Sequence, residues 1–88
     1  MKVNLRFIGS LALKTGNNKI EYELPASTTL DEAVRLVFKT YKLGNIGIDE
    51  NEISAGYLQI FLNRKIVPMS QILKEGDEIS FLPPLAGG

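Results

Sequence analysis

The chain has 88 residues, of which 44% are hydrophobic, and its ten basic and ten acidic side chains give a formal net charge of zero. This length allows one domain with a modest core and excludes a two-lobed enzyme or a doubly wound cofactor-binding sheet. The balanced charge argues against a nucleic-acid partner. Because a long apolar run and a signal-peptide pattern are both missing, we expect a soluble cytoplasmic protein without a membrane span.

The first quarter of the chain is predicted to form two amphipathic strands. Residues 2–8 and residues 19–24 alternate apolar and polar side chains with the period of two that is typical of a half-buried strand. A glycine and two asparagines at residues 16–18 end a connection, residues 10–15, that can hold a short helical turn. We therefore expect a hairpin of two strands joined by a long loop.

The strongest local signal indicates a helix that begins after Thr29. Thr29 and Glu32 form a capping box, in which each side chain satisfies one otherwise unpaired backbone donor. Lysines 39 and 42 suit the negative end of the helix dipole, and Gly44 is a natural residue to end the helix. Apolar residues at helical spacing form a single stripe, which consists of Leu30, Ala33, Val34, Val37, Phe38 and Tyr41.

The second half of the chain is predicted to add three strands. After a polar loop at residues 45–56, the apolar run at residues 57–62 indicates a central strand buried on both faces. Ile66-Val67, stopped by a proline, indicates a short edge strand. Residues 70–76 are typical of a helical turn, and residues 78–82 form the last strand.

This order of elements, β-β-α-β-β-β, predicts an α+β fold, the ubiquitin-like β-grasp. The mixed sheet should have about five strands and one main helix, with the first and last strands as parallel neighbours at its centre. Residues 1–82 would form the β-grasp domain, and residues 83–88 would extend from it as a flexible C-terminal tail. The fold alone does not define a function.

Three charged clusters could be sites, and each has a simpler structural explanation. The acidic residues within 49–52 lack the ligand spacing of a calcium loop. Asp77-Glu78 is adjacent on a strand, so its two carboxylates should face opposite sides. Arg64-Lys65 suits a hairpin tip better than a phosphate contact. Since the chain has no cysteine and no histidine, thiolate and imidazole chemistry is excluded, and we expect no catalytic residue and no metal site.

The last six residues differ from an ordinary frayed end. Two prolines favour an extended backbone, and glycines lack the Cβ that would block a narrow channel. Fully extended, the six residues would reach roughly 20 Å. The tail could therefore carry the α-carboxylate of Gly88 into another protein. The residues expected to enter that partner are Pro83, Pro84, Leu85, Ala86, Gly87 and Gly88.

The segment from Glu75 to Gly88, EGDEISFLPPLAGG, resembles the C-terminal signature of the MoaD family, the small sulfur-carrying subunits of molybdopterin synthase. The similarity covers essentially the whole chain, because residues 2–8, Gly16 and Leu62-Asn63 also match positions of that family. The chain departs from the family at Ala12-Leu13, where an Arg-Glu pair is frequent. It departs again at Leu82, where the family has the second of two aromatic residues.

The resemblance implies a carrier subunit that is not itself an enzyme. An activating enzyme that uses ATP and Mg would adenylate the Gly88 carboxylate, and a persulfide sulfur would then replace AMP to give a thiocarboxylate. The large subunit of molybdopterin synthase would transfer this sulfur to cyclic pyranopterin monophosphate, in molybdenum or tungsten cofactor biosynthesis. The chain itself would bind no cofactor.

Partners are expected to dock on the sheet face away from the helix, because one helix can cover only one face. The residues expected there are Phe81, Leu82 and the exposed part of the strand at residues 57–62. Two other functions remain open at this point. One is a sulfur carrier for thiazole synthesis or tRNA thiolation, and the other is a ubiquitin-like modifier joined to lysines of target proteins.

Overall fold

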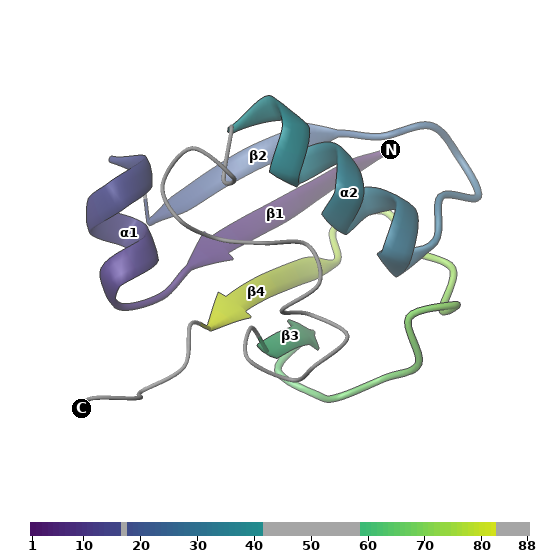
Figure 1. Ribbon diagram of the computed structural model, residues 1–88. Helices are drawn as coiled ribbons and strands as arrows, with labels where there is room; N and C mark the ends of the chain where they lie inside the picture. The colour runs from purple at the N-terminus through teal and green to yellow at the C-terminus, as the bar shows by residue number, and fades with distance from the viewer. Residues whose placement is uncertain (17, 42–58, 83–88) are drawn as a thin grey trace.

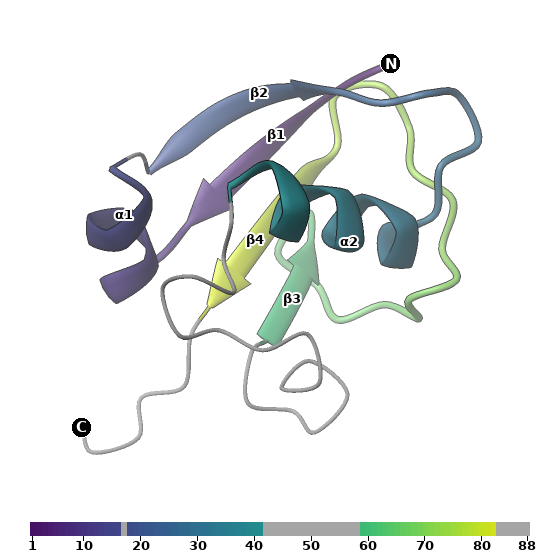
Figure 2. The same ribbon diagram turned by 45° about the horizontal axis from the view of Figure 1, so that its top comes forward.

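The computed structural model describes residues 1–16, 18–41 and 59–82. These residues form a four-stranded mixed sheet in the order β2-β1-β4-β3, with the longer helix packed across one face (Figures 1 and 2). The elements are β1 (Lys2–Phe7), α1 (Ser10–Thr15), β2 (Lys19–Glu23), α2 (Leu30–Thr40), β3 (Gln59–Leu62) and β4 (Glu78–Leu82).

The centre of the sheet is the parallel pair of β1 and β4, as the sequence predicted. Leu5 lies opposite Ile79 and Phe7 lies opposite Phe81 in this pair. The hairpin of β1 and β2 is also confirmed, because β2 pairs with β1 in the antiparallel direction. The β-grasp architecture is therefore the observed fold of the described residues.

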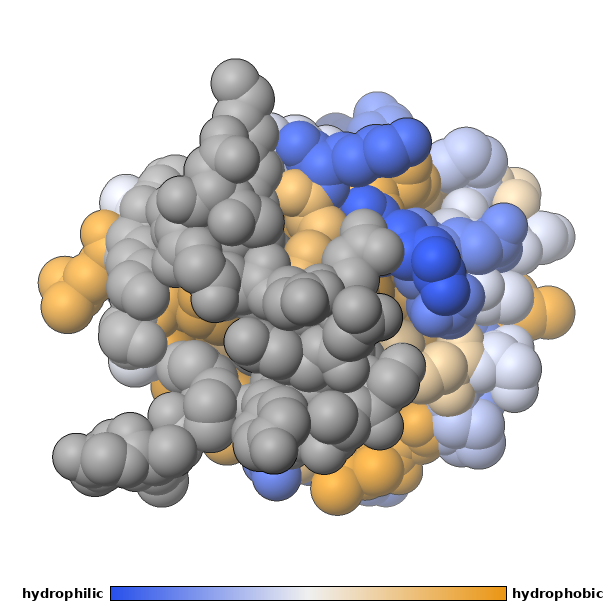
Figure 3. All heavy atoms as spheres, viewed as in Figure 1, coloured by the Kyte–Doolittle hydropathy of each residue, from blue (hydrophilic) through white to orange (hydrophobic). Residues whose placement is uncertain are grey.

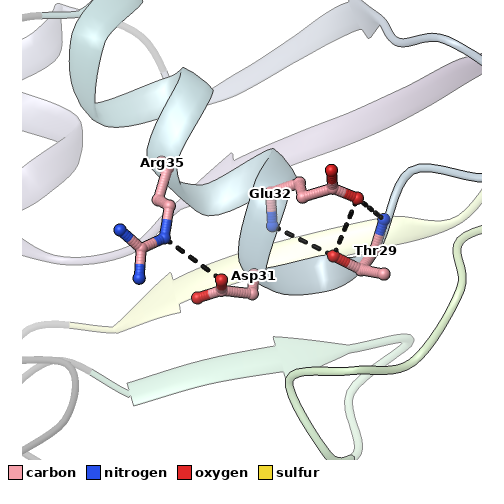
Figure 4. A network of polar contacts seen from close by, with 4 residues as sticks. All are labelled: Thr29, Asp31, Glu32 and Arg35. Carbon is pink, nitrogen blue, oxygen red and sulfur yellow. Dashed lines mark hydrogen bonds and ion pairs between the residues drawn. The ribbon is translucent and has the colours of Figure 1, made fainter.

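Helix α2 begins at the predicted capping box. The Thr29 hydroxyl accepts a hydrogen bond from the Glu32 amide at 3.2 Å, and the Glu32 carboxylate accepts one from the Thr29 amide at 3.0 Å (Figure 4). Asp31 and Arg35, one turn apart, add an exposed ion pair at 3.1 Å. The helix ends at Thr40, and the predicted end at Gly44 lies outside the described residues.

The core lies between α2 and the sheet. The predicted stripe of α2 is buried from Leu30 to Phe38, and the surface seen over α2 is mostly hydrophilic (Figure 3). From the sheet, Phe7 packs between two other rings, with centroid distances of 5.7 Å to Tyr41 and 5.3 Å to Phe81. These aromatic contacts join β1, β4 and the end of α2 into one cluster.

The prediction of a central strand at residues 57–62 is wrong. The described part of this strand, β3, pairs with β4 and forms one edge of the sheet. Gln59 is exposed and Phe61 only half-buried, whereas Ile60 and Leu62 alternate with them toward the core. The centre belongs instead to β1 and β4, because the last strand inserts beside the first. Residues 57 and 58 lie outside the described residues.

The strand predicted at Ile66-Val67 does not form, so the described sheet has four strands rather than five. The nearest pairing is the single bridge between Leu62 and Lys65 that closes a two-residue turn. The helical turn predicted at residues 70–76 is also wrong, since residues 69–70 and 75–76 form turns without a helix.

The start of α2 explains why this segment is irregular. The amides of Leu30 and Asp31 donate to the carbonyls of Gln71, at 2.8 Å, and Met69, at 2.9 Å. These two donors belong to the first helical turn and have no partner within the helix. Segment 66–73 therefore supplies hydrogen-bond acceptors to the first amides of α2 instead of extending the sheet. No helix in the described part of the chain is long and apolar enough to cross a membrane.

Candidate functional site

Strand β4 is the element that leads to the predicted functional tail. It is hydrogen-bonded on both sides, to β1 and to β3, and the Ile8 amide donates to the Phe81 carbonyl at 3.1 Å near its end. The chain therefore leaves the sheet at Leu82 from one of its two central strands. The tail itself, with Gly88 and the boundary proposed at residue 83, lies outside the described residues.

Phe81 does not lie on the open face of the sheet, which corrects the sequence-based expectation. Its side chain is 0% exposed and lies against Phe7 in the core. Successive side chains of a strand point to opposite faces, so Ile79 and Phe81 face α2 while Ser80 and Leu82 face the other side. The sequence of β4 has apolar residues on both faces, and only the position of α2 decides which of them are buried. Leu82 is half-buried on the open face, where docking was expected.

The open face carries a row of side chains that the sequence analysis did not bring together. Arg6, Ser80 and Phe61 are direct neighbours across β1, β4 and β3. Beyond Arg6, the next position in the row is Lys19 on β2. Taken one at a time these residues are ordinary strand residues, so no local signal distinguishes them.

A hollow of about 220 Å³ opens over this row. It is lined by Arg6, Ile8, Phe61, Arg64 and Ser80, and we call it the basic hollow. An adjoining depression of about 500 Å³ shares Arg6, Ile8 and Arg64, and adds Lys19 and Glu78 to the lining. Three basic side chains and a single acidic one therefore line this end of the open face.

The charged clusters near the hairpin have structural roles. The Asp77 carboxylate accepts hydrogen bonds from the Lys74 amide at 2.7 Å and from the Asn63 side chain at 3.0 Å. Glu78 lies 3.6 Å from the Arg64 guanidinium, as an ion pair across the turn. Asp77 is therefore a residue that stabilises the turn and Glu78 is the first residue of β4, and the two are explained without an acid/base pair.

The position of Arg64 at the hairpin tip is also confirmed. Asn63 and Arg64 both have positive φ, 51° and 66°, and the flanking Leu62 and Lys65 exchange backbone hydrogen bonds. The acidic loop at residues 49–52 lies outside the described residues. Within the described ranges, no cluster of three acidic, histidine or cysteine side chains could hold a metal ion.

Comparison with known proteins connects this fold and tail to a family. A sequence profile of the ThiS family matches residues 5–88. The molybdopterin synthase sulfur carrier subunit of Haemophilus influenzae is 39% identical over 36 residues, which are 41% of this chain and 44% of that relative. The matched stretch thus spans less than half the length of the curated relative.

Solved structures agree over the full length. A chain from the complex of subunits 1 and 2 of the Helicobacter pylori molybdopterin-converting factor matches with a TM-score of 0.59 and 28% identity, and the match covers 100% of both chains. SAMP1 of Haloferax volcanii has a TM-score of 0.84 with complete coverage of both chains, and its 16% identity shows a shared fold alone. With 84 of its 88 residues matched by the profile, the chain belongs to the ThiS family of ubiquitin-like proteins.

Proposed function

We propose that this protein is a sulfur carrier and the small subunit of a molybdopterin synthase. In this proposal the Gly88 carboxylate is first adenylated and then converted to a thiocarboxylate. The sulfur is given to cyclic pyranopterin monophosphate inside a large subunit. This chain contributes the reactive terminus and the docking surface, and its partners contribute the catalytic groups.

The observation that carries the proposal is the extent of the family match. The ThiS profile continues through Gly88, so it includes the Pro-Pro-Leu-Ala-Gly-Gly segment that directly follows β4. The named molybdopterin synthase relative supports the choice of pathway, as does the Helicobacter pylori complex of two subunits. The Asp77 and Glu78 carboxylates could have suggested catalysis in this chain. Asp77 instead accepts a hydrogen bond from the Lys74 amide, and Glu78 forms an ion pair with Arg64.

The chemistry of a terminal carboxylate explains why two partners are required. A carboxylate is a weak electrophile, and its reaction with ATP forms an acyl-adenylate and releases pyrophosphate. The terminal sulfur of a persulfide displaces AMP, which gives an acyl disulfide. A thiol then reduces this disulfide by two electrons and leaves the thiocarboxylate on Gly88. The carrier needs no cysteine of its own for this sequence, in accord with its composition.

The test is to purify the chain from its native cells and identify both its bound partner and the mass of its C-terminal peptide. We expect a large synthase subunit to co-purify, and we expect a fraction of the peptide to carry sulfur in place of one oxygen. A deletion strain should lose the activity of molybdenum or tungsten enzymes. Isopeptide adducts on other proteins with intact cofactor synthesis would instead indicate a modifier. Loss of thiazole or of thiolated tRNA would indicate one of the other carrier pathways.

A further inference from the structure

We propose that the basic hollow on the open face receives a carboxylate side chain of the protein partner that engages the tail. The proposal rests on the proposed function for the existence of that partner, and it adds the chemistry by which the partner is recognised. Four features of the hollow support it: positive charge at Arg6 and Lys19 that no described acidic residue pairs with, a buried hydroxyl without a partner among the described residues, a position near the end of β4, and the opposite charge at the other end of the face.

The first feature is the positive charge. Arg6 and Lys19 are direct cross-strand neighbours on the same face, and like charges in this arrangement repel each other. Among the described acidic residues, none forms an ion pair with either side chain. A bound anion would relieve this repulsion, so the free protein carries a local charge arrangement that a partner can satisfy.

Arg64 adds a third cationic side chain, ion-paired with Glu78 on one side, at a position that favours glycine. Two-residue hairpin turns with positive φ at both central residues prefer Asn-Gly, whereas the chain has Asn63-Arg64. The Arg64 side chain lines the basic hollow beside Arg6. Backbone strain of this kind is concentrated at functional sites. A long charged side chain kept at a strained position and facing a hollow therefore suggests a role in binding.

The second feature is the hydroxyl of Ser80. Its residue is 2% exposed, and Oγ has no hydrogen-bond partner among the described residues. It lies between Arg6 and Phe61 in the row across the sheet and lines the hollow. A carboxylate oxygen in the hollow could accept from Ser80 Oγ and from the Arg6 guanidinium, while its methylene groups would contact Phe61. This combination of donors and an apolar wall matches an aspartate or glutamate side chain.

The third feature is the position of the hollow. Ser80 and Leu82 lie on the same face of β4, two residues or roughly 7 Å apart along the strand. A protein that takes up residues 83–88 must approach the end of β4, and its surface will therefore extend over the hollow. The occupant is for this reason a protruding side chain of that protein. A small molecule would need a more enclosing cavity than about 220 Å³.

The fourth feature fixes the direction of docking. At the other end of the open face, Glu21 and Glu23 of β2 are exposed on the same side as Arg6. An acidic group of the partner is attracted to the end of the face near the tail and repelled from the far end. Complementary charge of this kind determines orientation and partner choice more than total affinity.

The experiment measures binding of the co-purifying large subunit to three variants of the full chain. Arg6→Gln and Arg64→Gly each remove one cation from the hollow, and Arg35→Gln removes an exposed cation from α2 as the matched control. Each hollow variant should weaken binding by about tenfold or more and reduce its salt dependence, while the control should bind like the parent. Arg6→Gln should also melt at or above the parental temperature, because it removes repulsion. Arg64→Gly should melt close to the parental temperature, because the relief of backbone strain offsets the loss of the exposed ion pair with Glu78.

A second measurement identifies the acidic group directly. Carbodiimide joins an amine to a carboxylate without a spacer, and Lys19 lies next to Arg6, so the complex should yield a bond between Lys19 and an aspartate or glutamate of the partner. Parental affinity in both hollow variants would overturn the inference. So would a complex in which Lys19 is not joined to a partner carboxylate.

Thiocarboxylation of Gly88 is followed separately, by mass, to keep the two proposals distinguishable. A thiocarboxylated chain whose hollow variants bind normally would contradict only the basic hollow. A chain that neither binds a large subunit nor becomes thiocarboxylated would overturn both proposals.

Discussion

Replacing Phe81 with alanine should severely destabilise the domain, because the side chain belongs to the core. The ring is 0% exposed and its centroid lies 5.3 Å from that of Phe7. A buried Phe→Ala substitution costs about 3–5 kcal/mol. A domain of this length has a free energy of unfolding of roughly 4–13 kcal/mol in total. At about 4–8 °C per kcal/mol, the melting temperature should fall by roughly 12–40 °C.

The assay is thermal and urea unfolding followed by circular dichroism, with Leu82→Ala as the neighbouring control. Leu82 is half-buried on the open face, so its truncation should cost less than half as much. The conservative variant Phe81→Leu should remain folded and bind the partner with parental affinity. A Phe81→Ala protein that melts within about 4 °C of the parent would refute the buried position. If Phe81→Leu had normal stability but bound the partner more weakly, Phe81 would have to be regarded again as a docking residue.

Three further predictions concern the helix, a tyrosine and the tail. Thr29→Ala removes the side-chain cap of α2 and should lower the free energy of unfolding by about 1 kcal/mol. The urea midpoint measures this loss, and an unchanged midpoint would contradict the role of the cap. Burial, with a smaller contribution from Tyr22, raises the pKa of Tyr41 above its ordinary value of 10.0. The contribution of Tyr41 to the free energy of unfolding should therefore be fully retained below about pH 10 and be lost as the pH rises through the higher folded pKa. Tyr41→Phe should flatten that decline of stability with pH, and an equally steep decline in the variant would contradict this prediction. Deleting Gly88 moves the terminal carboxylate back by up to about 3.5 Å. ATP–pyrophosphate exchange with the activating enzyme should therefore be lost, while the melting temperature stays unchanged. Near-parental exchange would contradict the carrier proposal.

The sequence by itself determined the elements whose signals lie within a few residues of each other. The capping box of Thr29 and Glu32 and the apolar stripe of α2 depend on neighbours three or four positions apart, so they could be identified without a structure. The alternation in β1 and β2 determined their buried faces in the same way. The resemblance at the C-terminus likewise rests on consecutive residues and led to the family that the comparisons support.

Tertiary structure alone decided the features that depend on contacts between distant residues. Whether Phe81 or Leu82 is buried depends on the side of the sheet that α2 covers, and both residues look equally suitable in the sequence. Segment 66–73 looked like a strand and a turn, yet its carbonyl groups are used by the first turn of α2. The basic hollow joins residues of β1, β3 and β4 with the residue that follows β1 and the hairpin tip, so no local pattern could reveal it. Cross-strand register is set by packing of the whole core, and it is this register that brings Lys19, Arg6 and Ser80 into one row.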